Sequence, residues 1–561
     1  MVKMERFVRW WGRKGAGRAL CAVAVVLLAA VIIQYRYMNE FPAFIHAWAQ
    51  DDRYALAVGF LNNGFDFFHP ETMIYNKQFP GWWAEASPTT VTAVDFPIHE
   101  YVVALLMKLL GTDSPWVFRG WSLLCSLVGL LFLYRLSFLL TRSFFKSLMV
   151  VMVTMTAPVY AYYFNGFIPS VPAFALAVAA VWAYVVYYRS GKGGYFSLGV
   201  ALFTLAMLIR TTFAIPLIAV CAFELLRVLC GESGWKNKIP VLLIAAVCYG
   251  GWFAWNSHLR AACGSLFLNE LMPPRSGAEV RELLADTWRN WGFQYFQIWH
   301  YLLFLLVVVA AVAAALRKKR VAAVLRRRNA VVLPKSSSSD DCCGREVMDS
   351  GKKAVPLWLL PAIMLFGDLL FAVAMMRQFP QHDYYFLDSF FLPLLLLFAC
   401  LLGWLPQPRL KWVKPASVLV ASAWVLLMLS HTVKTQKERR WLGDEAYQCY
   451  LHFQDADRFL DSLQVPADAK ILALYAYPQN GPFLQMRRKG YTVMRHKEPV
   501  VRAALRWNFS YIVVENEIFR AHFEERKEVL CRLSRVADNG RIALCTLSDN
   551  CCNATAEDFF K

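Results

Sequence analysis

The sequence predicts an α-helical membrane protein with many spans, followed by a small α/β domain. Of the 561 residues, 58% are hydrophobic, whereas soluble domains contain roughly 45–50% apolar residues. The apolar residues gather in runs of about 20, the length that a helix needs to cross the hydrocarbon core. Residues 432–561 instead show short alternating strand and helix patterns. We therefore expect a transmembrane domain over residues 1–431 and a soluble domain over residues 432–561.

Eleven apolar runs are expected to cross the membrane. The first, Ala19 to Ile33, follows a basic segment as a signal peptide would, but no small-residue cleavage site precedes Tyr35. We interpret it as an uncleaved span. The other ten fall near residues 116–135, 147–163, 167–188, 195–210, 212–230, 239–256, 298–316, 355–376, 384–404 and 415–431.

The distribution of basic residues predicts the orientation. Loop 317–353 carries eleven Lys or Arg residues, whereas the longer loop 34–97 carries three. Basic loops stay in the cytoplasm. The N-terminus and the basic linker 317–353, which suits anionic head groups, are therefore expected there. Loop 34–97 and, after an odd number of spans, residues 432–561 are expected outside the cytoplasm.

The net charge of +19 does not predict a nucleic-acid partner, because the basic residues lie in short clusters between apolar runs. The fourteen cysteines include no CxxC pair and no zinc-type Cys/His spacing. Four cysteines near the C-terminal end could form a disulfide if that end lies outside the cytoplasm: Cys531, Cys545, Cys551 and Cys552. The sequence does not determine which of them would pair.

Residues 432–561 predict a mostly parallel sheet covered by helices. Strand patterns occur at 470–475 and 511–514, and helix patterns occur at 455–463, 481–489, 500–507 and 519–535. The segment contains no GxGxxG turn or P-loop, so nucleotide binding has no support. A lid or an acceptor-docking domain is the favoured interpretation.

The stretch from Trp48 to Gly111 is the candidate active site, because long loops without a span of their own are usually functional. Asp51 and Asp52 open it. Either aspartate alone reads more readily as the start of a solvated helix. Trp48 and Tyr54 flank the pair, however, and such aromatic residues concentrate at the membrane interface. A carboxylate there can remove a proton from an acceptor hydroxyl.

A second acidic site is expected at the end of this stretch. Asp95 and Glu100 precede an apolar segment, Tyr101 to Leu110, that is too short to span and fits an amphipathic helix in the interface. Asp95 by itself is also compatible with a turn carboxylate. Both ends of the stretch thus place carboxylates at one membrane surface.

Cations and tyrosines at the outer ends of later spans are candidates for holding a phosphate. Arg210 and Arg377 could each bind it through the guanidinium, although Arg210 could also snorkel to the interface. His382, Tyr384 and Tyr385 follow Arg377 closely. The tyrosines are equally compatible with an interface belt, and His382 would ligate zinc only if partners converged on it.

These motifs, in this order, resemble the polyprenyl-phosphate-sugar glycosyltransferases of the GT-C superfold, which include protein O-mannosyltransferases and bacterial lipid A aminoarabinose transferases. The matching stretches are Asp51-Asp52-Arg53-Tyr54-Ala55, Asp95-Phe96-Pro97 with the run to Gly111, Arg210 after Leu-Ile, and His382-Asp383-Tyr384-Tyr385. The resemblance covers most of residues 1–431, and the α/β tail also resembles bacterial members.

The resemblance implies inverting transfer of a sugar from a polyprenyl-phosphate donor to a hydroxyl of a protein, glycan or lipid. It places the enzyme in the bacterial inner (plasma) membrane, with its site outside. An aspartate of the first loop would be the base, and Arg53, Tyr54 and the later cations would hold the donor. The usual Asp-Glu pair is Asp51-Asp52 here, and Asp52 is favoured because it adjoins Arg53. Metal use varies in the family. The resemblance therefore does not establish a cofactor, and use of a divalent cation is left as an alternative.

Two other classes fit the sequence less well. A lipid or sugar transporter would be expected to show inverted repeats and carboxylates near the membrane midplane. A membrane-anchored assembly protein would leave the paired acids and Arg210 without a role. The sugar, the carrier and the acceptor are not determined by the sequence.

Overall fold

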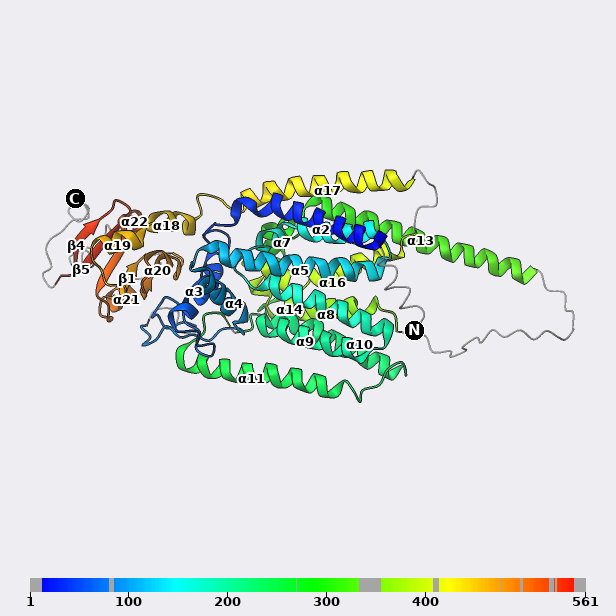
Figure 1. Ribbon diagram of the computed structural model, residues 1–561, viewed down its shortest axis with the longest axis horizontal. Coiled ribbons are helices and arrows are strands. Elements are labelled where there is room, and N and C mark those ends of the chain that lie inside the picture. Colours follow the sequence, from blue (N-terminus) through cyan, green and yellow to red (C-terminus); the bar gives the residue numbers. More distant parts are fainter. Residues whose placement is uncertain are drawn as a thin grey trace.

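The computed structural model describes residues 13–79, 85–268, 270–331, 355–406, 413–475, 477–494, 498–523, 529 and 532–548. A bundle of long helices forms the larger part, and a small α/β domain lies at one end of it (Figure 1). Helices α3 (Ala47–Asn62) and α4 (Ile98–Leu110), both from the first loop, lie between these two parts (Figure 1). The predicted interfacial segment is thus helical.

Within the described chain, seven helices are long and apolar enough to cross a membrane, and four shorter apolar helices accompany them. They correspond one to one to the predicted runs, so the polytopic helical fold is confirmed. The helices of this part are α2 (Arg13–Gln34), α5 (Pro115–Thr141), α6 (Phe144–Thr156), α7 (Pro158–Tyr163), α8 (Ser170–Ser190), α9 (Gly193–Ile209), α10 (Ala214–Leu229), α11 (Ile239–Cys263), α12 (Gly277–Tyr295), α13 (Ile298–Val331), α14 (Leu359–Ala374), α15 (Tyr384–Asp388), α16 (Phe391–Trp404) and α17 (Val413–Glu438).

Proline and glycine shape the bundle locally. The run predicted at 147–163 divides into α6 and α7 at Pro158, which has no N–H to continue a helix. Gly129 of α5 lets α8 approach so closely that a Cβ on it would stand 2.5 Å from the Ala175 Cβ. Small residues at such contacts let helix backbones pack together where lipid removes the hydrophobic drive.

Helix α13 is longer than the sequence analysis predicts. We expected a linker from residue 317, but the helix continues to Val331. The segment is rich in Ala, Leu and Arg, which are strong helix formers. Its extension points away from the α/β domain (Figure 1). Residues 332–353 of the predicted linker lie outside the described residues.

The C-terminal domain contains a five-stranded sheet in the order β2-β1-β3-β5-β4. Strand β1 pairs in parallel with β2 and β3, whereas β5 is antiparallel to both β3 and β4. Its elements are α18 (Glu445–Phe453), α19 (Ala456–Ser462), β1 (Ile471–Leu474), α20 (Gly481–Met486), β2 (Gly490–Val493), α21 (Glu498–Ala504), β3 (Tyr511–Glu515), α22 (Asn516–Phe523), β4 (Leu533–Asp538) and β5 (Ile542–Leu547). The predicted α/β class is confirmed.

The prediction of a mostly parallel sheet is wrong in its second half. The helix expected over 519–535 ends at Phe523, and the chain enters β4 at Leu533. Strand β4 forms a hairpin with β5 through Asn539-Gly540, where Gly540 has a φ of +85°. Asn-Gly between two strands is a hairpin signal, because both residues tolerate positive φ. That signal was present in the sequence.

The first loop is bound to the C-terminal domain through backbone and amide contacts. Ile74 bridges Gly490 in parallel, which extends the free edge of β2. The side-chain amide of Asn76 donates to the Thr492 carbonyl at 2.9 Å and accepts from its N–H at 2.8 Å. Loop and tail therefore form one folded unit at one end of the bundle.

This arrangement predicts opposite protease exposure for the two ends. In sealed vesicles with the outer face outward, protease should cut within residues 432–548 and spare residues 317–331, because these segments lie at opposite ends of the helices. Lysed vesicles serve as the control and should lose both segments. Immunoblotting with tags at each segment measures the result. Protection of the tail in sealed vesicles would contradict the topology.

Candidate active site

A cavity of about 670 Å³ lies where the bundle, helix α3 and the C-terminal domain meet. Its walls come from α3, from the segments after α9, α11 and α14, and from residues that begin the tail. The polar side chains that line it are His46, Asp52, Asp95, Arg210, Thr211, Thr212, Gln378, Gln381, His382, Tyr384, Tyr385 and Asp444. Six of the residues predicted from the sequence are in this set: Asp52, Asp95, Arg210, His382, Tyr384 and Tyr385.

Asp52 is held by the C-terminal domain. Its Oδ1 accepts hydrogen bonds from Gln479 Nε2 and Asn480 Nδ2, both at 2.8 Å. Its Oδ2 is buried and has no hydrogen-bond partner among the described residues. Burial raises the pKa of Asp52 to about 8, although Asn480 and Arg53 act in the opposite direction. The group can therefore both release and accept a proton close to neutral pH.

Asp51 does not line this cavity. Both of its oxygens are buried without a hydrogen-bond partner in the described part of the chain. One of them lies beside Gly481, where a Cβ would stand 2.6 Å from Asp51 Oδ2. Burial, reinforced by Asp52, raises the pKa of Asp51 well above its usual range. Asp51 is therefore placed away from the cavity in a niche that disfavours its charged form.

A chain of alternating charges connects α3 to the bundle. Arg53 contacts Asp95 at 3.1 Å, and the same Asp95 oxygen lies 3.9 Å from Arg210. Arg210 also binds Asp388, with its Nε at 3.0 Å from the carboxylate. The Arg210 guanidinium stacks 5.4 Å above the ring of Tyr384. Arg210 thus faces the cavity as a fixed cation that already has two acidic neighbours.

Besides Asp51, three predicted site residues of the first loop lie outside the cavity. Glu100 is 1% exposed and binds Arg53 Nη1 at 2.9 Å, so its side chain is paired inside the protein and its acceptor role stays a prediction. Arg53 is buried by this pair and by the ring of Phe267, 4.1 Å away. Tyr54 points from another side of α3 and donates its hydroxyl to the Asp113 carbonyl. The geometry of helix α3 explains why Arg53 and Tyr54 point away from the cavity while Asp52 faces it, because successive residues project about 100° apart.

Arg377 is also outside the cavity. It lies in the 3₁₀ turn η3 (Met376–Gln378), and its Nε contacts Glu279 Oε1 of α12 at 3.2 Å. The neighbouring Met375 and Gln378 line the cavity instead. Arg377 is therefore paired with Glu279 away from the cavity, and its role in holding the donor phosphate stays a prediction. Helix α12, which lies between two predicted spans, supplies the partner that the sequence analysis missed.

His46 is a cavity residue that the sequence analysis did not identify. It precedes α3 with a φ of 56°, a left-handed conformation that His adopts more readily than most residues. Its ring stacks on that of His382, 5.5 Å away, and meets the ring of Tyr384 edge-on at 5.2 Å. Its Nε2 lies 3.0 Å from Asp383 Oδ1. In the sequence, a single histidine ahead of an acidic pair does not predict a contact with Asp383, which lies 337 residues later.

Asp383 is fully buried behind this group. Tyr163 donates its hydroxyl to Asp383 Oδ1 at 2.7 Å, and Arg439 binds the other oxygen. Burial opposes ionisation, but Arg439 and His46 outweigh it and hold the pKa of Asp383 well below its usual range. Asp383 is therefore a permanent anion that fixes the direction of the His46 ring.

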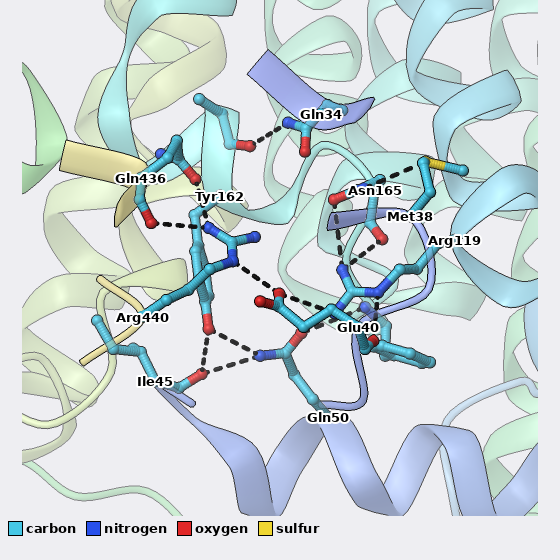
Figure 2. Close-up of polar contacts among 12 residues, drawn as sticks. Gln34, Met38, Glu40, Ile45, Gln50, Arg119, Tyr162, Asn165, Gln436 and Arg440 are labelled. Carbon is cyan, nitrogen blue, oxygen red and sulfur yellow. Dashed lines mark hydrogen bonds and ion pairs between the residues drawn. The ribbon is translucent and has the colours of Figure 1, made fainter. Parts of the chain in front are cut away.

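A polar network fixes the approach to α3 from the bundle side (Figure 2). Arg440, just after α17, donates to Glu40 Oε2 at 2.6 Å, and Arg119 of α5 donates to the Glu40 carbonyl at 2.7 Å. Gln50 of α3 donates to the Ile45 carbonyl at 2.9 Å. These contacts anchor the turn that carries His46 and the first turns of α3, so the cavity is preorganised rather than carried on a free loop.

Among the described residues, the group placed to hold a metal ion is outside the cavity. His452, Glu515 and Glu517 offer ligand atoms within 4.8 Å of one another. They lie in the C-terminal domain, whereas His382 is close to His46 without forming such a group. The possibility of zinc at His382 has no support from this arrangement.

Comparison with known proteins agrees with this architecture. Residues 93–255 match the family model described as dolichyl-phosphate-mannose-protein mannosyltransferase. ArnT from Cupriavidus metallidurans, solved bound to undecaprenyl phosphate, is similar over 94% of this chain and 98% of its own, with a TM-score of 0.55 and 13% identity. The chain has the GT-C fold.

A second solved relative is larger. The arabinofuranosyltransferase AftD from Mycobacteria is similar over 97% of this chain but 40% of its own, with a TM-score of 0.51 and 14% identity. A comparison with curated protein sequences finds no significant match. At these identities the solved structures support the fold, and the details of the site depend on the residues of this chain.

Substitution of the two aspartates should separate their roles. Asp52→Asn preserves shape and removes basicity, so sugar transfer should fall by ~10²–10⁴. Asp51→Asn should retain most activity, because Asp51 does not line the cavity. Initial rates in purified, reconstituted protein measure both. A dead Asp51→Asn beside an active Asp52→Asn would move the base by one residue, and two active variants would remove the base from this pair.

The pH dependence of the reaction rate should change when Asp52 loses a hydrogen bond from the C-terminal domain. A base must be ionised to accept a proton, so if Asp52 is the base the rate should rise as pH increases through about 8. Gln479 lowers the pKa of Asp52; Gln479→Leu should therefore shift that rise to higher pH, with a lower rate at pH 7 that recovers at alkaline pH. Gln485→Leu, on the nearby helix α20, is the matched control and should leave the profile in place.

Proposed function

We propose that this protein transfers a sugar from a polyprenyl-phosphate donor to an acceptor hydroxyl at the extracytoplasmic face of the membrane. The observation that carries the proposal is one cavity that contains both an ionisable carboxylate, Asp52, and a fixed cation, Arg210, at the end of the bundle. The GT-C fold and the mannosyltransferase family match support the same class. The acceptor hydroxyl belongs to a protein, a glycan or a lipid, and the membrane is that of a bacterial cell.

Two of the residues that line the cavity suit the two parts of the reaction. Asp52 Oδ2 accepts the proton of the attacking hydroxyl as the acceptor oxygen bonds to the anomeric carbon. The bond from that carbon to the phosphate oxygen breaks, and its electron pair leaves with the phosphate. The guanidinium of Arg210 stabilises the negative charge that develops on the departing phosphate. Attack and departure on opposite faces of the sugar invert the anomeric centre.

The apolar side of the cavity suits the lipid part of the donor. Phe371 and Met375, at the end of α14, line the cavity. Three further α14 side chains, Phe366, Leu369 and Leu370, are exposed on the helix surface. An exposed apolar face on a spanning helix contacts lipid. A polyprenyl chain could therefore stay in the membrane along α14 while its phosphate reaches Arg210.

Arg210→Ala should raise the KM for the donor with little change in acceptor dependence. A hydrogen bond to a charged group contributes ~1.5–3 kcal/mol, or roughly tenfold to a hundredfold in affinity. Arg377→Ala is the matched control, because Arg377 lies outside the cavity, and should leave donor KM unchanged. Arg210→Lys retains a charge near Asp95 and Asp388 and tests whether a loss reflects folding. Equal donor KM in all proteins would remove the phosphate role of Arg210.

The activity itself is tested with purified protein in lipid nanodiscs and a panel of undecaprenyl-phosphate sugars. Transfer should release undecaprenyl phosphate, detected by mass spectrometry, and Asp52→Asn should abolish that release. Lipid extracts from cells with and without the gene should show the natural donor accumulating in its absence. Unchanged lipid-linked sugars in cells, together with no release from any donor in vitro, would overturn the proposed function.

A further inference from the structure

A cluster of three metal-ligating side chains lies in the C-terminal domain, and none of the three lines the cavity described above. His452 is in the last turn of α18, Glu515 ends strand β3, and Glu517 is in the first turn of α22. One ligand atom from each lies within 4.8 Å of the other two. The two carboxylates thus come from a single strand–helix junction, and the imidazole comes from a helix that packs against β3.

Glu515 is the residue that points to a cation. Its side chain is fully buried, and its Oε1 lies 2.5 Å from His452 Nδ1. The other oxygen of the same carboxylate, Oε2, is buried and has no hydrogen-bond partner among the described residues. A buried carboxylate is costly unless it is paired or coordinates a metal. The contact with His452 therefore satisfies only half of this group.

The charges around His452 also favour a cation. Its Nε2 lies 3.5 Å from Glu517 Oε2, so each ring nitrogen has a carboxylate beside it. In the described part of the chain, the ion-pair contacts of Glu515 and Glu517 are with His452 alone. Arg541 donates instead to the Leu451 carbonyl, at 3.0 Å. A single imidazole cannot balance two carboxylates, whereas a divalent cation can.

The donor atoms are those that zinc prefers. Zn²⁺ binds His nitrogen and Glu oxygen at ~2.0–2.2 Å, often with three protein ligands and one water, whereas Mg²⁺ and Ca²⁺ take oxygen ligands. Two ligands on opposite sides of one zinc ion are therefore up to about 4.4 Å apart. Glu517 is 81% exposed, so its side chain can make the small inward turn that this distance requires.

We propose that His452, Glu515 and Glu517 bind one Zn²⁺ ion that fastens α18 to the junction of β3 and α22. The ion replaces the hydrogen bond between His452 and Glu515 with metal–ligand bonds and balances the buried carboxylate. The site is separate from the cavity, so the proposal does not depend on the proposed function.

Helix α18 connects this site to the cavity. The ring of Tyr447 stacks on that of Phe44 at 4.7 Å, and Cys449 Sγ accepts a hydrogen bond from the Tyr477 N–H at 3.3 Å. Phe44 and Tyr477 both line the cavity. An ion that holds the end of α18 against the sheet should therefore stabilise the contacts between the C-terminal domain and the first loop. Because a ligand that binds only the folded state stabilises it, Zn²⁺ should raise the Tm.

Zinc titration of the full chain tests the site, with protein that carries no histidine tag, is reconstituted in nanodiscs and has been treated with a chelator. The wild type should retain one Zn²⁺ per chain after gel filtration, measured by elemental mass spectrometry, and its Tm should rise. Glu517→Gln should weaken Zn²⁺ binding by at least ~10–100-fold, the loss that removal of an outer-shell partner already causes. Because Glu517 is exposed, this variant should fold and match the metal-free Tm of the wild type.

Glu515→Gln should lose Zn²⁺ binding as well, whereas Asp66→Asn is the matched control. Asp66 pairs with His69 at 2.7 Å, but among the described residues this pair has no third ligand, so the variant should keep wild-type Zn²⁺ affinity. Mg²⁺ in place of Zn²⁺ should not raise the Tm. Equal Zn²⁺ retention by the wild type and Glu517→Gln, or no retention by the wild type, overturns the site. Either result would leave the proposed function standing if the wild type transfers sugar.

Discussion

The site depends on a buried carboxylate that receives hydrogen bonds from another domain. Asp52 belongs to the first loop, and its amide donors, Gln479 and Asn480, come from the C-terminal domain. Burying a carboxylate is costly unless hydrogen bonds replace the water it loses. Two neutral amides replace only part of that water, so the pKa stays high without the group becoming permanently neutral. The C-terminal domain is therefore part of the cavity and not merely a lid over it.

The same contact ties the domain to the loop. Asn480 also accepts a hydrogen bond from the Met73 N–H at 3.1 Å, so one side chain links the aspartate, the loop and the start of α20. The Asn76–Thr492 pair and the strand contact at Gly490 hold the same two segments together. Gly490 is required there, because a Cβ would stand 1.8 Å from the Ile471 carbonyl oxygen. A shift of the domain would therefore change the environment of Asp52.

The arginines in and around the cavity are paired with carboxylates in different ways, and this gives them different roles. Arg53 forms ion pairs with Glu100 and Asp95, and these pairs hold α3 against the neighbouring segments. Arg210 shares Asp95 but remains at the cavity wall, where a phosphate would compete with its acidic neighbours. Arg439 neutralises Asp383, which lies behind the His46 ring. Breaking a buried pair costs more than the pair itself contributes, because the remaining charge is uncompensated. These pairs are therefore sensitive positions even where they do not touch a substrate.

The sequence by itself determined the features that depend on local periodicity. Runs of apolar residues gave the spans, and the carboxylates of the first loop pointed to the correct end of the bundle. Local patterns also gave β1, β3 and most of the helices of the tail. They missed β2, the short strand Gly490–Val493. They also missed β4 and β5, because an edge hairpin is defined by pairing between strands rather than by the hydrophobicity of either one.

Only the tertiary structure decided which side chains share the cavity. Asp51 and Asp52 are adjacent and chemically alike, and the helix turn between them sends one to the cavity and the other to a buried niche. Arg210 and Arg377 looked equivalent, but α12 supplies Glu279 to one of them. His46 meets Asp383 across 337 residues, and Asp52 meets Gln479 across 427. Such contacts are set by how the helices pack and how the tail folds back on the loop, and a single sequence carries no local signal for either.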